Sequence, residues 1–298
     1  MLLQLIKAIR PINLLVITLT FYVLHTLGIN SLEISPGTYQ ISLKFLIIST
    51  LLIAAAGYLI NDYYDKEIDF INKGNKQNPL SKQVLLTVYI ILNITALILS
   101  FTFAFSNYIF WIFPISIILL WLYSYRLKGL PFIGNLIVAL LSAAVPFIYL
   151  SIQEISIGGL TNSHTNSADL IIIFSILALF STLARELVKD IEDIAGDKAQ
   201  GLKTTPILWG IKTAKFWTIF FLLCTLFILG LLTAGIDYFD FNILSLVIAA
   251  IFGFLPLLLS VAKSYEATEK KHYKQSGNLI KISMFGFLLF IYIHAITL

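Results

Sequence analysis

The sequence consists mainly of long apolar segments that are separated by short polar ones. Each apolar segment holds about 20 residues, the length that an α-helix needs to cross the hydrocarbon core of a bilayer. The pattern predicts an all-α, polytopic membrane protein. We expect nine transmembrane helices, at residues 11–29, 43–60, 84–104, 108–125, 134–152, 169–187, 213–234, 243–262 and 278–298.

The composition supports this prediction, because 58% of the residues are hydrophobic and only 12% are charged. A soluble domain has about 25% charged residues, so this chain has too little polar surface to cover a water-soluble globule. The apolar segments continue from one end to the other, and we therefore expect a single integral membrane domain over residues 1–298. With one cysteine, Cys224, the chain cannot form an internal disulfide.

The basic residues predict the orientation of the helices. If the N-terminus is cytoplasmic, 19 of the 20 Lys and Arg residues fall on the cytoplasmic side, and only Lys44 falls on the other. Membrane proteins follow this asymmetry. The net charge of +4 is therefore explained by topology and by anionic lipid, and no separate basic patch points to nucleic acid. Two long, charged cytoplasmic loops are predicted near residues 61–83 and 188–212.

Nine of the 16 acidic residues are concentrated in two short stretches that follow apolar segments. Each stretch contains aspartates at positions i, i+3 and i+7: Asp62, Asp65 and Asp69 in the first, and Asp190, Asp193 and Asp197 in the second. On an α-helix these positions lie within an arc of about 60°. We therefore expect each set of carboxylates to share one helix face at the cytoplasmic edge of the membrane.

Carboxylates on one face repel each other unless a cation lies between them. Their oxygens suit Mg²⁺, which commonly joins one or two carboxylates to substrate phosphates. A solvated face with lysine pairs would explain one such cluster, but two clusters with equal spacing on the same side favour a shared function. The pattern indicates Mg²⁺ sites for a diphosphate, whose remaining charge could be balanced by Lys128, Lys189, Lys198 and Lys203.

These stretches resemble the motifs of the UbiA-type intramembrane prenyltransferases. The segment from Asn61 to Asp69 resembles their first aspartate-rich motif, N-D-x-x-D-x-x-x-D, and Asp193 to Asp197 resembles the second, D-x-x-x-D. The nine predicted spans agree with the architecture of that family. The resemblance therefore extends over nearly the whole chain.

Two further segments carry the resemblance. Residues 10–13, Arg-Pro-Ile-Asn, resemble the opening helix of the family, and residues 123–128, followed by Gly134-Asn135, resemble the stretch after its fourth helix. The chain departs from the family after the first motif, where Lys73 and Lys76 stand in a segment that carries arginines in many members. Lysine keeps the charge but loses the bidentate geometry of arginine toward phosphate.

The resemblance implies Mg²⁺-dependent transfer of a prenyl group from a prenyl diphosphate to a lipophilic or amphiphilic acceptor in the membrane. The catalytic residues that it implies are Asp62, Asp65, Asp193 and Asp197. Further metal contacts are implied for Asn61, Asp69 and Asp190. We expect the diphosphate to contact Lys73, Lys76, Lys128, Lys189, Lys198 and Lys203. We expect the substrates to contact Asn13, Tyr63, Tyr123 and Tyr125.

Within the family, residues 185–198 and the segment Lys203-Thr204-Thr205-Pro206 most resemble the enzymes that prenylate geranylgeranylglyceryl phosphate. Prenylation of an aromatic quinone precursor and cyclisation of the donor are alternatives. A divalent-cation transporter and a non-catalytic lipid-binding protein belong to other functional classes. The aspartates cluster at one edge of the membrane rather than along a path across it, which favours the enzyme over the transporter.

Overall fold

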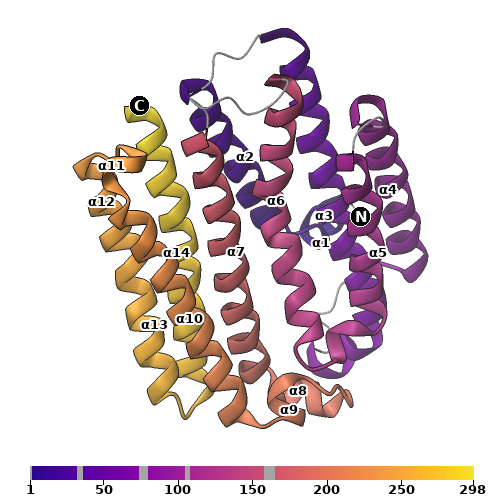
Figure 1. Ribbon diagram of the computed structural model, residues 1–298. Coiled ribbons are helices and arrows are strands. Elements are labelled where there is room, and N and C mark those ends of the chain that lie inside the picture. Colours follow the sequence, from indigo (N-terminus) through magenta and orange to yellow (C-terminus); the bar gives the residue numbers. More distant parts are fainter. Residues whose placement is uncertain (1, 32–35, 74–79, 105–107, 158–164) are drawn as a thin grey trace. The chain divides into compact units, whose positions relative to one another are not determined.

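The computed structural model describes residues 2–31, 36–73, 80–104, 108–157 and 165–298. Within these ranges every regular element is a helix (Figure 1). Eight of the described helices are long and apolar enough to cross a membrane, and Ile109–Tyr125 is a shorter apolar helix. The prediction of an all-α, polytopic membrane protein is confirmed, whereas the count of nine spans stays a prediction.

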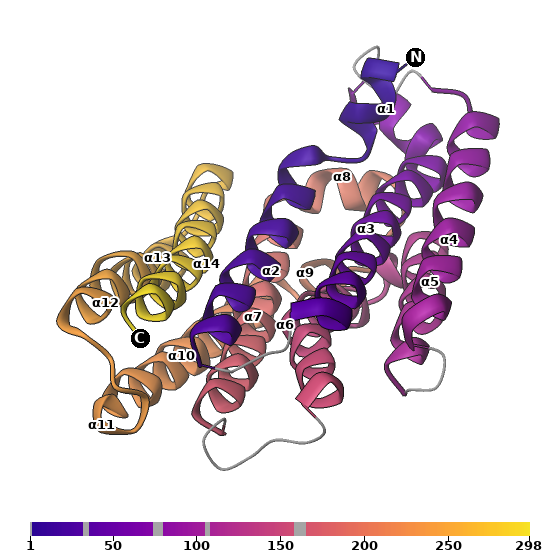
Figure 2. The same cartoon turned by 90° about the horizontal axis from the view of Figure 1, so that it is seen from above.

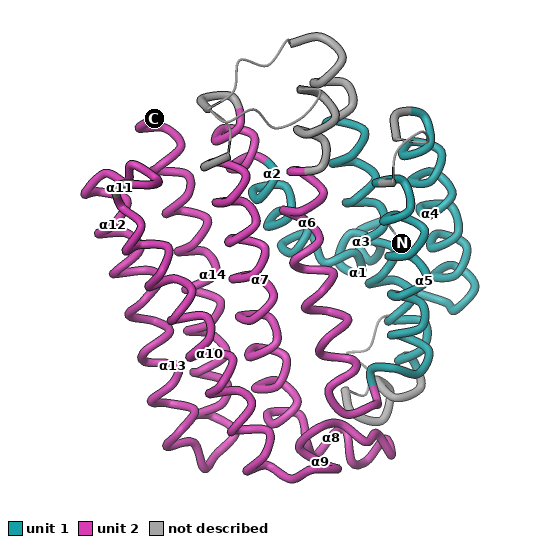
Figure 3. The backbone as a smooth tube through the Cα atoms, viewed as in Figure 1, with its two compact units in different colours: residues 1–21, 35–128 teal, residues 22–34, 129–298 magenta. Residues whose placement is uncertain are grey.

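The chain divides into two compact units, which Figure 3 draws in teal and magenta. Unit 1 comprises residues 1–21 and 35–128, and unit 2 comprises residues 22–34 and 129–298. The division falls inside one helix, because α2 (Pro11–Ser31) contributes its first half to unit 1 and its second half to unit 2. The single domain over residues 1–298 stays a prediction.

Unit 1 is built around α3, which packs against α4 and α5. Figure 2 shows α4 beside α3. The contact with α5 is close because Gly57 lacks a side chain, and a Cβ placed there would lie 3.0 Å from Cδ1 of Leu120. The elements of unit 1, besides the first half of α2, are α1 (Leu2–Ala8), α3 (Pro36–Lys73), α4 (Lys82–Ala104), the 3-10 turn η2 (Tyr108–Trp111) and α5 (Ile112–Tyr125).

The first aspartate-rich stretch is part of α3. The segment that we predicted as a loop near residues 61–83 is therefore helical as far as Lys73. The helix can continue because no Gly or Pro stands between Gly57 and Gly74. Lys66 then ties α3 to the segment before α4, since its Nζ donates to the carbonyl of Leu80. The first motif thus stands on a continuous helix.

In unit 2, α7 packs against α6, α10 and α14, and Figure 2 shows α13 and α14 side by side. The chain passes into this unit through the 3-10 turn η3 (Leu127–Gly129). Its further elements, besides the second half of α2, are α6 (Ile133–Ile157), α7 (Thr165–Glu192), α8 (Ile194–Ala199), α9 (Thr205–Leu208), α10 (Ile211–Ala234), α11 (Ile236–Phe239), α12 (Ile243–Ile248), the π-helix η5 (Ala249–Phe254), α13 (Leu255–Glu266) and α14 (Lys270–Thr297).

Helix α10 shows why this fold requires a membrane. One of its faces packs inside unit 2, where Phe221, Leu222 and Leu229 are buried. The opposite face is exposed but equally apolar, and it carries Phe216, Phe220, Leu223, Phe227 and Leu231. A helix that is apolar on all sides needs lipid or protein around it. We therefore assign the exposed face of α10 to lipid.

The eighth predicted span is one continuous helical element that contains the π-turn η5. Pro256 has no N–H, so it cannot donate the usual helical hydrogen bond to the carbonyl of Phe252. Helix α14 packs closely against this part of the chain. Ser283 Oγ donates to the carbonyl of Gly253 at 3.0 Å, and Gly286 packs so closely that an added Cβ would lie 2.2 Å from the carbonyl oxygen of Phe252.

We expect Gly286→Ala to lower the apparent Tm of the purified protein in detergent by about 5 °C or more. The added carbon would meet backbone atoms, and overpacking of this kind costs about 1–3 kcal/mol. The matched control is Gly230→Ala on α10, where nothing lies within 4 Å of the added Cβ. The control should melt at or slightly above the wild-type temperature. Equal melting of both variants would show that the contact does not constrain the fold.

Candidate functional site

Two aspartates of the first motif, Asp62 and Asp65, each lie beside a basic side chain within unit 1. Asp65 forms an ion pair with Lys128, which follows α5. The amide Nδ2 of Asn61 donates to Oδ2 of the same carboxylate at 2.9 Å, one helical turn away. The structure therefore brings together three residues that we predicted for metal and diphosphate, and the amide fixes the orientation of the Asp65 carboxylate.

Asp62 lies beside Arg10, with 3.6 Å between its Oδ1 and Nη2 of the arginine. Arg10 stands between α1 and α2 and has a φ of 52°, in the left-handed region. This conformation costs an ordinary residue about 1–2 kcal/mol. Arg10 was not among the predicted site residues, although a signal was present, because Arg10 opens the segment of residues 10–13 that resembles the family.

Tyr58 connects Arg10 to the first motif. The guanidinium lies over the ring of Tyr58, with Cζ 4.8 Å from the ring centroid. Asn13 Nδ2 donates to the hydroxyl of the same tyrosine at 3.1 Å. Tyr58 is four residues before Asp62 on α3, so its ring and that carboxylate share one helix face. The predicted substrate residue Asn13 therefore contacts the tyrosine that also supports Arg10.

The tyrosines around the first motif divide into two groups. Tyr63 packs against the buried apolar cluster that α1, α3 and α4 form, and the Lys82 ammonium lies 5.6 Å from its ring centroid. Tyr125 stacks on Trp121 at 5.4 Å and contacts Tyr64 at 5.5 Å between ring centroids. The predicted substrate role of Tyr63, Tyr123 and Tyr125 stays a prediction, and for Tyr63 the structure shows a packing role.

In unit 2, the last turns of α7 carry a second group of acidic side chains. Asn135 of α6 donates from Nδ2 to Oδ2 of Asp190 at 2.8 Å. Glu186, one turn earlier, is buried and pairs with the guanidinium of Arg185. Asn135 was not among the predicted site residues. An amide in the first turn of α6, just before a long apolar run, is the signal that could have found it, because such groups usually bond inside the bundle.

The second motif does not lie on one continuous helix, which corrects the shared face that its spacing predicted. Helix α7 ends at Glu192 and α8 begins at Ile194, while Asp193 adopts φ −99° and ψ 7°. These angles belong to the bridge region, which interrupts regular helix geometry and which active-site residues often occupy. Asp193 lies 3.6 Å from the ammonium of Lys270 at the start of α14. Asp193 thus lies at the junction of α7 and α8 and contacts α14.

Asp197 lies on α8, and the chain beyond it is tied to the start of α6. Thr204 Oγ1 donates to Oδ2 of Asp197 at 3.3 Å. Thr205, which is fully buried, accepts a hydrogen bond from the N–H of Phe132 at 2.9 Å. Phe132 has a φ of 65°, which is strained for an aromatic residue. These bonds hold the segment after Asp197 against the turn that leads to Asn135.

The predicted lysines of the second motif, Lys189, Lys198 and Lys203, are exposed. Their ammonium groups could therefore reach a ligand, and Lys203 is also fixed through its backbone N–H, which donates to the carbonyl of Gly129 at 2.9 Å. Among the remaining predictions, Asp69 and Lys73 lie on α3, and Lys76 lies outside the described residues. The contact predicted for these residues with a diphosphate stays a prediction.

Within the described residues, no group of three or more His, Cys, Asp or Glu side chains is gathered closely enough to hold a metal ion. The donor set still fits Mg²⁺, because the described motif residues supply carboxylate and amide oxygens. Mg²⁺ usually takes only one or two carboxylates and completes its shell with water and substrate phosphates. The metal contacts of both motifs stay a prediction.

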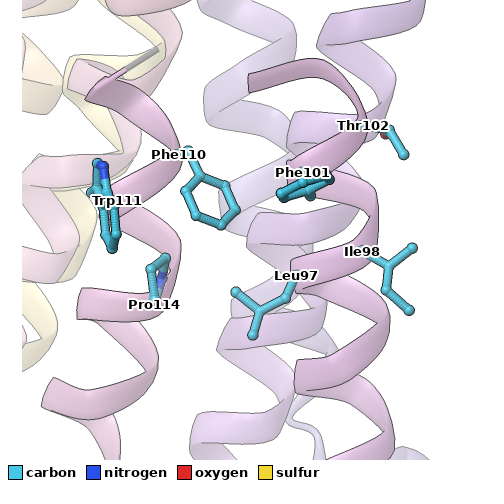
Figure 4. A pocket seen from close by; sticks show the side chains of 7 residues that line it. All are labelled: Leu97, Ile98, Phe101, Thr102, Phe110, Trp111 and Pro114. Atoms are coloured by element: carbon cyan, nitrogen blue, oxygen red, sulfur yellow. The ribbon is translucent and has the colours of Figure 1, made fainter. Parts of the chain in front are cut away.

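An apolar cleft of about 390 Å³ lies elsewhere in unit 1, between α4 and the segment η2–α5 (Figure 4). It is lined by Leu97, Ile98, Phe101, Thr102, Phe110, Trp111 and Pro114. The cleft is near the end of α4 that is remote from Lys82 and contains none of the motif residues. Its lining suits a hydrocarbon chain but offers no group for metal or phosphate.

The sequence was compared with families and proteins that are already known. The sequence profile of the UbiA prenyltransferase family matches residues 14–289. A digeranylgeranylglyceryl phosphate synthase from Thermococcus sibiricus is 34% identical over 300 residues, which cover 95% of each chain. These matches extend over both aspartate-rich motifs.

Solved structures agree with the sequence comparison. A structure described as digeranylgeranylglyceryl phosphate synthase in membranes has a TM-score of 0.74 and 25% identity, with 100% of this chain and 99% of that chain covered. A UbiA homologue from Archaeoglobus fulgidus, bound to GPP and Mg²⁺, has a TM-score of 0.57 and 15% identity, with 97% and 99% covered. The second likeness concerns the fold.

We expect Thr205→Val to lower the apparent Tm by about 2–8 °C, because it leaves the N–H of Phe132 without its acceptor inside the protein. An unsatisfied buried donor costs about 1–3 kcal/mol. Thr205→Ser keeps the hydroxyl and is the matched control, for which we expect a smaller loss. If the valine variant melts no lower than the serine variant, the hydrogen bond does not hold the turn before α6.

Proposed function

We propose a specific reaction for this chain, which belongs to the UbiA prenyltransferase family. It transfers a prenyl group from a prenyl diphosphate to the hydroxyl of geranylgeranylglyceryl phosphate. Membership of the family makes the chain a prenyltransferase. The observation that carries the choice of acceptor is the match of 95% of the chain to a digeranylgeranylglyceryl phosphate synthase. The likeness at a TM-score of 0.74 to a structure with the same description supports it.

The residues proposed to hold Mg²⁺ are Asp62, Asp65, Asp193 and Asp197, with Asn61, Asp69 and Asp190 assisting. The metal, when bound, neutralises the diphosphate and stabilises the negative charge that grows on it as the C1–O bond breaks. Support comes from the oxygen donors described above and from the A. fulgidus homologue, which binds Mg²⁺ and GPP. Asn61 and Asn135 then act by orienting the carboxylates of Asp65 and Asp190.

The lysines are proposed to bind the diphosphate. Lys128 lies beside Asp65 and is placed to donate to a phosphate that approaches the same carboxylate. The other proposed donors are Lys73, Lys76, Lys189, Lys198 and Lys203.

The C1–O bond breaks with its electron pair going to the diphosphate, and the oxygen of the acceptor hydroxyl bonds to C1 and loses its proton. Asn13, Tyr63, Tyr123 and Tyr125 are proposed to contact the two substrates, where aromatic faces favour a cationic C1.

We expect diphosphate release from geranylgeranyl diphosphate to require both Mg²⁺ and geranylgeranylglyceryl phosphate. The measurement uses protein purified in detergent, with parallel reactions that contain this acceptor, an aromatic quinone precursor or no acceptor. EDTA should abolish release, and excess Mg²⁺ should restore it. Diphosphate release with only the aromatic acceptor would mean that the acceptor is a quinone precursor and not geranylgeranylglyceryl phosphate. Diphosphate release without an acceptor, together with a cyclic product, would indicate a cyclase. No release with any of them would argue against an enzyme.

In the same assay, Asp65→Asn and Asp193→Asn should each lower kcat by about 100-fold or more, because each removes one charge from the proposed metal ligands. The matched control is Asp240→Asn at the end of α11. Asp240 has a φ of 56°, which asparagine tolerates, and it is not part of either motif. The control should keep wild-type activity. An equal loss in all three variants would point to instability rather than to lost metal ligands.

We infer from the distribution of Lys and Arg that the N-terminus and both motifs face the cytoplasm. In a Cys224→Ser background, we expect a membrane-impermeant maleimide to label Asp240→Cys on intact cells and to label Gln200→Cys only after permeabilisation. Within unit 2 these positions lie at opposite ends, after α11 and after α8 (Figure 1). The reverse labelling pattern would invert the topology.

A further inference from the structure

Arg10 lies outside both aspartate-rich motifs and was not among the predicted site residues. We propose that Arg10 is a diphosphate-binding residue that competes with the divalent cation for Asp62. When the cation takes this carboxylate, the guanidinium turns to the anionic oxygens of the prenyl diphosphate. The inference rests on the proposed function, because it requires a donor with a diphosphate and a metal at the first motif.

The geometry of the ion pair allows such an exchange. Nη2 of Arg10 lies 3.6 Å from Oδ1 of Asp62, which is longer than a strong hydrogen bond. The arginine side chain is 45% exposed, whereas the aspartate is 15% exposed. A guanidinium carries five N–H donors and binds carboxylate and phosphate with the same fork. The exposed donors of Arg10 are therefore accessible to a ligand that approaches Asp62.

Tyr58 keeps the guanidinium in place when it leaves Asp62. Cζ of Arg10 lies 4.8 Å from the ring centroid, and this attraction does not depend on the carboxylate. Asn13 donates to the tyrosine hydroxyl and so connects the ring to α2. Arg10 is thus supported by an aromatic face one helical turn before Asp62. It would remain within reach of a ligand at that carboxylate rather than swing into water.

The backbone restrains Arg10 as well. Its φ of 52° lies in the left-handed region, and the residue that follows is Pro11, which further restricts the backbone. The N–H of Arg10 donates to the carbonyl of Lys7 at 3.2 Å, and its carbonyl accepts from the N–H of Asn13 at 2.9 Å. A strained residue that is held from both sides is typical of a functional position.

If Arg10 first competes with the cation and then binds the donor, its removal should change the two affinities in opposite directions. Without the donor, Arg10 neutralises Asp62 and weakens the binding of a divalent cation. With the donor present, Arg10 contributes charge-assisted hydrogen bonds and strengthens the complex. A purely structural role would move both affinities in the same direction. The comparison of the two affinities therefore tests the proposal without relying on enzyme activity.

The experiment measures two affinities for the full chain in detergent. Mn²⁺ binding without donor is followed by the electron paramagnetic resonance signal of the free ion. Binding of a non-reactive thiolo analogue of geranylgeranyl diphosphate is measured at saturating Mn²⁺. We expect Arg10→Gln to bind Mn²⁺ at least about twofold more tightly, because Asp62 then loses a competing cation from an ion pair that is only partly exposed. We expect it to bind the analogue about tenfold or more weakly.

Three further variants separate the contributions. Arg10→Lys keeps the charge, so it should bind Mn²⁺ like the wild type but recover only part of the affinity for the analogue. Tyr58→Leu removes the ring and should weaken analogue binding severalfold. The matched control is Lys7→Gln, because Lys7 is an exposed cation on α1 one turn before Arg10. This control should change neither affinity, and thermal unfolding verifies that each variant is folded.

Each outcome decides between the hypotheses. If Arg10→Gln weakens Mn²⁺ and analogue binding together, Arg10 is structural and the proposal fails. If the wild type and Arg10→Gln bind the analogue equally, the proposal also fails, while the proposed function stands. If the wild type does not bind the analogue at saturating Mn²⁺, the prenyl diphosphate function fails, and the inference about Arg10 fails with it.

Discussion

The structure depends on one constraint, which is that a carboxylate near the hydrocarbon of a bilayer needs a partner for its charge. Five aspartates of the two motifs have such a partner in another segment of the chain, namely Asp62, Asp65, Asp190, Asp193 and Asp197. Asp62 pairs with Arg10 before α2, Asp65 with Lys128 after α5, and Asp193 with Lys270 of α14. These pairs join segments that are far apart in the sequence. The same carboxylates therefore serve the fold of each unit and the chemistry that we propose.

The helical spans could be predicted from the sequence because the signal for a span is local. About 20 apolar residues in a row are sufficient, and α10 begins and ends within two residues of the span predicted at 213–234. The extension of α3 to Lys73 and the interruption at Asp193 could not be predicted in this way. Both depend on which hydrogen bonds compete at the polar end of a helix. The π-turn before Pro256 likewise depends on how α14 packs against the carbonyl of Phe252.

The aspartates of the candidate site could be predicted because their spacing is visible in the sequence, but their partners could not. The contacts of Tyr58, Asn135 and Thr205 come from other segments of the chain. Asn135 lies 55 residues from Asp190, and Thr205 lies 73 residues from Phe132. Spacing along one helix carries no information about such pairs. A search for isolated polar residues within apolar helices would have found Tyr58 and Asn135.

The partners of the aspartates are of two chemical kinds, and the difference has a consequence for catalysis. Asn61 and Asn135 are neutral amides, so they can keep their hydrogen bonds to Asp65 and Asp190 when a metal ion approaches. Arg10 and Lys128 carry positive charge, so a divalent cation repels them from the carboxylates. The side chains of the Arg10–Asp62 pair are 45% and 15% exposed, and those of the Lys128–Asp65 pair are 16% and 20% exposed. In the proposed reaction, a metal–diphosphate complex that displaces these cations must therefore give each of them a new partner. In the proposed reaction, the displaced cations would then face the diphosphate, whose oxygens offer a new partner for each.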